Sequence, residues 1–265
     1  MNKVIALTLS SLLSFQVAAH SRWVLPSHFT LSADKGEWIM VDVTASNETF
    51  NVDKPMGSDN VRIITPDGKK SRPSSSYRGH RKSVVDYFVA GDGTYKITNN
   101  GEAGYMTYFK VGDKRQRMRI SKAQYDQLPA GASNVKTSYR LARIESYVTM
   151  NNPSENFATD GRLLELVPVT HPSDIAQGEQ ATFKLLFNGK AQAKVAVEIT
   201  REGVRYRNDP QTLKLTSNAQ GEVSFTPKHA GRYLLVAEHE QATPNNKLAD
   251  EASGEVFLSF EVLLD

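Results

Sequence analysis

The chain has 265 residues, of which 39% are hydrophobic and 23% charged, and it contains no cysteine. This is the composition of an ordinary globular protein, and the length suits one large domain or two domains of about 100–150 residues. Without cysteine the chain can form no disulfide, iron–sulfur cluster or thiolate metal site, and it has no cysteine nucleophile. The formal charge of +3 is small and the basic residues are spread along the chain, so nothing indicates nucleic-acid binding.

One short basic run interrupts this even distribution, at residues 114–119. A run of this kind could hold a phosphate or an acidic partner. More often it is a solvated loop or the edge of a strand, and that is the structure we expect here.

The amino terminus predicts secretion. A basic start at residues 1–3 precedes an apolar and hydroxyl-rich stretch at residues 4–17, and the small residues Val17 and Ala19 occupy the positions that signal peptidase requires. We expect a signal peptide over residues 1–19, a mature chain that begins with His20, and a periplasmic location. No other segment approaches the ~20 apolar residues of a membrane-spanning helix, so no integral membrane span is expected.

Period-two alternation and turn residues predict strands along the remainder of the chain. In the first block they cover residues 37–43, 61–64, 84–89, 95–97, 105–109 and 139–150, the last of which could begin as a helix. A short helix is expected over residues 121–128, where Pro129 stops it. In the second block the strands cover residues 164–168, 181–187, 195–199, 223–225, 233–236 and 256–262, with a hairpin turn at Asn188-Gly189.

This pattern predicts an all-β protein with two immunoglobulin-like β-sandwiches in tandem. We expect the first domain over residues 20–160 and the second over residues 161–265, joined near residues 151–163. Both blocks contain Gly-x-Tyr at the start of a strand, at residues 93–95 and 231–233. This resembles the tyrosine corner, in which the phenol bonds a backbone group a few residues upstream.

An N-terminal histidine is a metal ligand in its own right. The free amine and the ring Nδ1 of His20 can chelate one ion together, because the amine has a pKa near ~8 and gives up its proton readily to a divalent metal. One further imidazole would complete a copper site, and carboxylate or water would adapt the site to nickel, cobalt or zinc.

Two other histidines are candidate partners for that ion. His239 follows a buried strand and has a carboxylate on each side, and His80 lies in a cationic loop. His171 fits better as a structural histidine at the domain junction, and His28 and His229 as surface or turn residues. No two histidines are spaced at i, i+2 or i, i+4, so the sequence contains no dense local set of metal ligands.

Catalytic signatures are missing from the sequence. There is no G-x-S-x-G nucleophile elbow, P-loop or dinucleotide fingerprint, so we expect no catalytic and no cofactor-binding residues, and a protein that is not an enzyme. An alternative is a sugar-binding platform built from aromatic side chains, although strand aromatics are more often core. The candidates for such a platform are Trp23, Trp38, Tyr105 and Tyr108.

Several segments together resemble a family of uncharacterised bacterial periplasmic proteins described as NikM-like nickel-uptake components. The similar segments are residues 19–27, 164–174, 178–179, 186–190, 205–207, 219–221 and 230–233. The chain departs from the family at residues 191–193, where relatives often carry proline after the turn. The resemblance implies a soluble β-sandwich protein that works beside an outer-membrane receptor or a nickel/cobalt transporter, with His20 at the family's initial histidine.

These observations predict a non-enzymatic binding or delivery protein for a transition metal, which would be nickel, cobalt or copper. The metal ligands would be His20, His239 and His80, and the protein partner a metal-uptake transporter or a TonB-dependent outer-membrane receptor. One alternative is a carrier of an organic or metal-chelate ligand that assists such a receptor. Another is a copper-dependent oxidase, which would also begin with histidine on a β-sandwich.

Overall fold

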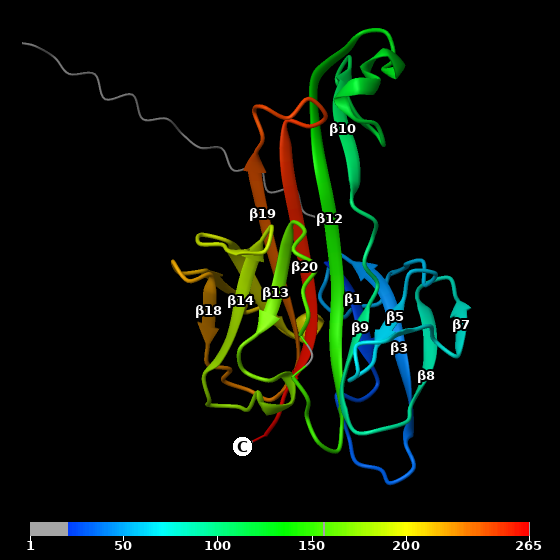
Figure 1. Ribbon diagram of the computed structural model, residues 1–265, viewed down its shortest axis with the longest axis vertical. Helices are drawn as coiled ribbons and strands as arrows, with labels where there is room; N and C mark the ends of the chain where they lie inside the picture. Colours follow the sequence, from blue (N-terminus) through cyan, green and yellow to red (C-terminus); the bar gives the residue numbers. More distant parts are fainter. Residues whose placement is uncertain (1–20, 156, 265) are drawn as a thin grey trace, which may run out of the picture.

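The computed structural model describes residues 21–155 and 157–264, and nearly all of its regular structure is β (Figure 1). Three short 3-10 helices complete it: η1 (Lys122–Gln127), η2 (Pro172–Asp174) and η3 (Val204–Tyr206). Within the described ranges, no helix is long and apolar enough to cross a membrane. The predicted signal peptide, residues 1–19, and His20 lie outside the described residues.

The first sheet is antiparallel, with the strand order β1-β3-β8-β7, and β4 pairs with the end of β3. One face of this sheet carries alternate apolar residues such as Ile39, Val41 and Val43, which are buried. The strands are β1 (Ser21–Pro26), β3 (Glu37–Ser46), β4 (Lys54–Pro55), β7 (Ser75–Arg78) and β8 (Ser83–Val89).

The second sheet is the largest and contains strands from both halves of the chain. Its main path runs β17-β16-β19-β20-β12-β9-β5-β6, and β2, β10 and β11 attach beside it. The strands are β2 (Thr30–Leu31), β5 (Arg62–Ile64), β6 (Lys70–Ser71), β9 (Gly93–Thr98), β10 (Gly104–Val111), β11 (Lys114–Met118), β12 (Ala132–Met150), β16 (Ala196–Arg201), β17 (Leu213–Thr216), β19 (Gly231–Ala242) and β20 (Glu251–Val262).

The third sheet covers the C-terminal half of the second. In it β14 pairs with β13, β15 and β18. The strands are β13 (Leu164–Pro168), β14 (Ala181–Phe187), β15 (Lys190–Ala191) and β18 (Glu222–Phe225).

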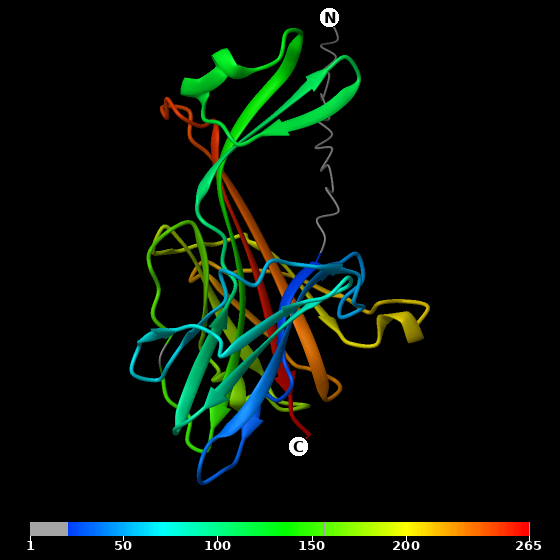
Figure 2. The same ribbon diagram turned by 90° about the vertical axis from the view of Figure 1, so that its right-hand side faces the viewer.

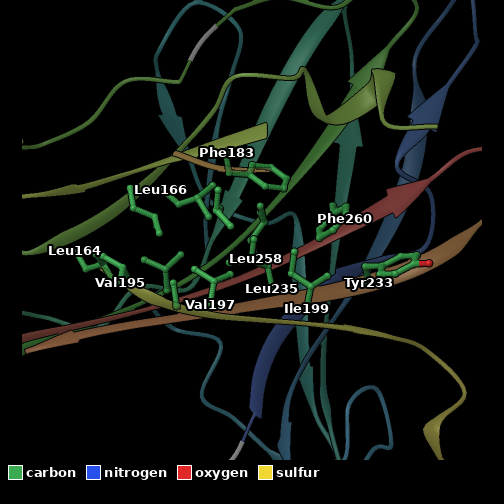
Figure 3. Close-up of a cluster of buried hydrophobic side chains, with 14 of the residues drawn as sticks. Leu164, Leu166, Phe183, Val195, Val197, Ile199, Tyr233, Leu235, Leu258 and Phe260 are labelled. Carbon is green, nitrogen blue, oxygen red and sulfur yellow. The ribbon is translucent and has the colours of Figure 1, made fainter. Parts of the chain in front are cut away.

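Two hydrophobic cores result, one between the first and second sheets and one between the second and third. The first core is built mainly from residues 23–150 and the second mainly from residues 163–262. Figure 3 shows the second core, where Phe183 of the third sheet lies near Leu258 and Phe260 of β20. The predicted all-β class, with two packed sandwiches, is confirmed.

The two sandwiches share one continuous sheet, because β12 pairs in parallel with β20 over nine residue pairs from Ser138↔Glu251 to Ser146↔Ser259. Each core therefore takes side chains from the other half of the chain: Leu234 and Phe257 enter the first core, and Leu141 and Tyr147 enter the second. The alternation that predicted the individual strands carried no information about this parallel pairing.

Both predicted tyrosine corners are present. The Tyr95 hydroxyl donates to the Gly91 carbonyl at 2.9 Å, and the Tyr233 hydroxyl donates to the His229 carbonyl at 2.7 Å. Both bonds span four residues, so one strand from each half of the chain, β9 and β19, begins in the second sheet with the same local hydrogen bond.

The connection at residues 151–163 is fastened to the body. The amides of Asn151 and Asn152 donate to the Asp92 carboxylate at 2.6 and 2.9 Å. Further along, the buried Arg143 of β12 donates to the Asp160 carboxylate at 2.6 Å and to the Leu164 carbonyl at 3.0 Å. The connection is thus tied to the body both near residue 151 and near residue 160.

The long strands extend beyond both cores as an arm, made of residues 105–138 and 240–251 (Figures 1 and 2). β12 is continuous through this region, so the possibility of a helix at residue 139 is excluded, while the expected helix at residues 121–128 is the 3-10 helix η1. Lys122 holds the arm together through a 2.7 Å ion pair with Asp250.

Candidate functional site

A hollow of about 690 Å³ lies at the base of the arm. Its lining includes four arginines and one acidic residue, Glu102. The lining residues are Arg22, Asn60, Gly101, Glu102, Gly104, Tyr105, Met106, Arg117, Arg119, Arg140 and Ala142. The excess of positive charge in a concave site favours an anionic ligand.

Arg22 and Arg140 form the inner wall and share one carboxylate. The Glu255 carboxylate of β20 lies 3.0 Å from the Arg140 guanidinium and 3.5 Å from that of Arg22. Arg140 also donates to the Tyr108 hydroxyl, and Arg22 lies over the Phe257 ring, 5.4 Å from its centroid. Although burial by itself lowers the pKa of Arg140, the Glu255 carboxylate raises it above its usual value. One carboxylate therefore holds two guanidinium groups.

Arg117 and Arg119 form the outer wall, on and just after β11. Arg117 stands opposite Tyr108 of β10, and both arginines are exposed. Among the described residues, neither guanidinium has a hydrogen-bond or ion-pair partner. A free guanidinium presents a planar fork of donors that matches a carboxylate or a phosphate in a bidentate fashion.

Tyr105 and Met106 give the hollow an apolar side. The Tyr105 ring packs on the Tyr139 ring with centroids 5.0 Å apart, and both Tyr105 and Met106 are half-buried. A few charged groups beside an aromatic and a thioether are typical of sites for organic molecules. The arrangement suits an organic anion better than a small inorganic one.

His20, the first predicted metal ligand, lies outside the described residues. The next residue, Ser21, pairs with Ser46 of β3, and Arg22 after it lines the hollow. His20 is therefore two positions along the chain from an arginine of the site.

His80 is exposed in the turn between β7 and β8. β8 starts opposite Val43 and β1 starts opposite Ser46, so this turn and the start of β1 lie near the same end of β3. The neighbours Arg81 and Lys82 make the turn cationic, as the sequence indicates.

His239 is half-buried on β19, opposite Gly254. Its ring packs edge-on against Phe187, with centroids 4.8 Å apart, and burial lowers its pKa, which favours the neutral imidazole that a metal requires. The preceding residue, Glu238, stands opposite Glu255, so strand alternation places His239 on the other face of the sheet from the Arg22–Glu255 contact.

Within the part of the chain that the structure describes, no group of three or more histidines and carboxylates is placed to hold a metal ion. The set of His20, His80 and His239 stays a prediction. His171 does bond the junction, as expected: its Nε2 lies 3.0 Å from the Thr94 hydroxyl and its Nδ1 2.7 Å from the Ser173 hydroxyl.

The hollow was not predicted from the sequence. The basic run at residues 114–119 predicted a solvated loop or strand edge; the edge strand β11 is there, and Arg117 on it and Arg119 just after it line the site. A signal was available, since Arg115, Arg117 and Arg119 recur at the period of a strand. Nothing in the sequence linked them to Arg22 or Arg140, which come from distant strands.

A family profile described as a domain of unknown function (DUF4198) matches residues 17–241. The chain belongs to this family. The matched region contains every residue that lines the hollow and all three predicted metal ligands, whereas β20 with Glu255 lies beyond it. A search of curated proteins found no match.

The solved structures that match the chain have low sequence identity to it and superpose on it poorly. The D0–D1 domain of intimin is 13% identical, with 91% of this chain and 97% of that chain covered and a TM-score of 0.24. The Yersinia pseudotuberculosis adhesin InvE is 10% identical, with 92% and 60% covered and a TM-score of 0.23. Trypsin-activated alpha-2-macroglobulin from Escherichia coli is 13% identical, with 90% and 23% covered and a TM-score of 0.21. Overlaps of this size carry no argument about function.

Proposed function

We propose that this protein is a non-enzymatic binding protein that carries an anionic organic ligand in the arginine-lined hollow. The observation that carries the proposal is the pair Arg117 and Arg119, two guanidinium groups that face a concave site without a partner among the described residues. Arg22 and Arg140 supply further donors on the opposite wall. Charge-assisted hydrogen bonds from arginine contribute about 1.5–3 kcal/mol each, enough to hold a carboxylate in water.

The ligand that accounts for both the hollow and the sequence is an anionic chelate of a transition metal. A bare divalent cation would be repelled by Arg117 and Arg119, which have no carboxylate partner among the described residues, whereas an ion that arrives with carboxylate ligands brings the complementary charge. His20 would then complete the coordination of nickel, cobalt or copper, since it precedes Ser21 at the start of β1. Geometry would set the choice of metal, because raw affinity at nitrogen sites favours copper.

A direct metal site at His20 is the second candidate. It is favoured by the position of the His80 turn near the start of β1. In either case we propose a periplasmic protein that assists a metal-uptake transporter or a TonB-dependent outer-membrane receptor.

Calorimetric titration of the secreted protein tests the proposal, after mass spectrometry has established its first residue. The probes are citrate, Ni²⁺ and the nickel–citrate complex. We expect Arg117→Gln combined with Arg119→Gln to weaken citrate binding at least tenfold, because two charge-assisted contacts of about 1.5–3 kcal/mol each are lost. The matched control is Arg72→Gln combined with Arg205→Gln, which removes the same charge from two exposed arginines elsewhere.

The outcomes separate the two candidates. Nickel–citrate that binds more tightly than citrate, and loses this advantage in His20→Ala, supports the chelate. Ni²⁺ binding that depends on His20 but is unchanged by the Arg117 and Arg119 substitutions supports the direct metal site. Equal citrate affinity in the double variant and in its control would overturn the arginine site. Peroxide production from copper and ascorbate would point instead to the oxidase.

A further inference from the structure

A second hollow, of about 640 Å³, lies on the solvent-facing side of the first sheet. We infer that it binds an organic ammonium group, which the face of Trp38 and the carboxylate of Asp86 recognise together. The site shares no residue with the arginine-lined hollow. Its lining residues are Ser27, His28, Trp38, Ile39, Met40, Ser74, Ser75 and Asp86.

The apolar part of this site is unusually exposed for a sheet. Trp38 is 54% exposed and Met40 is 58% exposed, while their neighbours Ile39 and Val41 are buried on the opposite face of β3. Phe88 of β8 stands directly across from Trp38, with ring centroids 5.3 Å apart. A cross-strand aromatic pair stabilises the strands. It also leaves a broad aromatic surface open to a ligand.

The charge of the site is negative. Asp86 accepts a 2.6 Å hydrogen bond from the Ser75 hydroxyl, and within the described ranges no basic side chain forms an ion pair with it. The lining contains no lysine or arginine. The imidazole of His28 is the other titratable group in the lining, and its Nδ1 is 3.1 Å from the Ser27 hydroxyl. A carboxylate without a cationic partner, beside an open indole, suits a positively charged ligand.

Aromatic faces attract cations through the ring quadrupole, and tryptophan does so most strongly. Quaternary ammonium ligands are recognised in this way because their charge is spread over methyl groups that also pack against the ring. Met40 adds a polarizable surface and Asp86 adds the opposite charge. An anion would meet Asp86 unfavourably, so the two hollows of this protein are selective for ligands of opposite charge.

Tryptophan fluorescence tests the inference directly. The chain has two tryptophans, and Trp23 is buried in the first core at 1% exposure, so a ligand-dependent change reports on Trp38. We expect choline to shift the emission at millimolar concentrations, with sodium chloride as the ionic-strength control. The neutral analogue 3,3-dimethyl-1-butanol replaces the ammonium nitrogen with carbon, and we expect it to bind about tenfold more weakly.

Three variants complete the test. Asp86→Asn should weaken choline binding about tenfold, whereas Asp113→Asn removes the same charge from an exposed carboxylate outside the site and should bind choline as the unsubstituted protein does. Trp38→Leu, measured by calorimetry, should abolish binding. Equal affinity for choline and its neutral analogue, or an unaltered Asp86→Asn variant, would overturn the inference, as would the absence of any spectral change. A sugar that binds while choline does not would show a carbohydrate platform instead.

Discussion

At the scale of single residues, the clearest internal symmetry of the molecule lies in Tyr95 and Tyr233. Each phenol is buried, and each returns to a carbonyl four residues earlier in the chain. The strands that follow them, β9 and β19, belong to the same sheet but to different cores. Each hydrogen bond spans only four residues. It therefore fixes the start of its own strand, independently of the strand's pairing partners.

We predict that Tyr95→Phe and Tyr233→Phe each lower the free energy of unfolding by about 1 kcal/mol, the usual contribution of one hydrogen bond. Urea denaturation measures the effect. Tyr206→Phe is the matched control, because Tyr206 is 86% exposed and should tolerate the change without loss. Three indistinguishable denaturation midpoints would show that the two corner bonds contribute nothing.

At the scale of elements, β20 packs closely against β13 at Gly254, a contact that the alternation of the sequence does not indicate. An alanine Cβ at Gly254 would lie 2.4 Å from the Leu164 Cβ and 2.6 Å from the Leu164 nitrogen. Gly254 stands opposite His239, so the absence of a side chain allows β13 to approach β20 at this point. Position 254 therefore requires glycine, because the backbones of β13 and β20 approach closely there.

We predict that Gly254→Ala destabilises the protein by about 1–3 kcal/mol, because an added methyl group would force β13 and β20 apart. Thermal unfolding should show the loss as a lower Tm. Gly104→Ala on β10 is the control: a Cβ there meets nothing within 4 Å, and Gly104 has no positive φ. The prediction fails if both variants melt at the same temperature.

At the scale of the whole molecule, the shared sheet couples the two sandwiches. β12 and β20 lie side by side at its centre, and side chains from both strands enter both cores. Unfolding either core would expose the apolar face of strands on which the other depends. We therefore expect the tandem sandwiches to behave as one cooperative unit.

Leu185→Ala in the second core and Ile63→Ala in the first should each lower the stability of the whole protein by about 2–5 kcal/mol. Both positions are fully buried. Differential scanning calorimetry should show a single transition that moves to lower temperature in each variant. Two transitions, of which each substitution moves only one, would show that the sandwiches unfold independently.

Local rules determined much of this protein from the sequence by itself. The alternation at residues 164–168 and 181–187 gave those strands with their observed limits, and the two Gly-x-Tyr segments gave the corners. These features depend on backbone geometry and burial within a few residues, which the sequence displays directly.

The tertiary structure alone decided the shared sheet and both hollows. Parallel pairing of β12 with β20 joins residues more than a hundred positions apart, and no local pattern specifies such a partner. Arg22, Arg117 and Arg140 line one hollow although they come from three different strands, β1, β11 and β12. The sequence also did not show that Trp38 is exposed. Alternation indicates which residues share a face of the strand but not which face the core will cover.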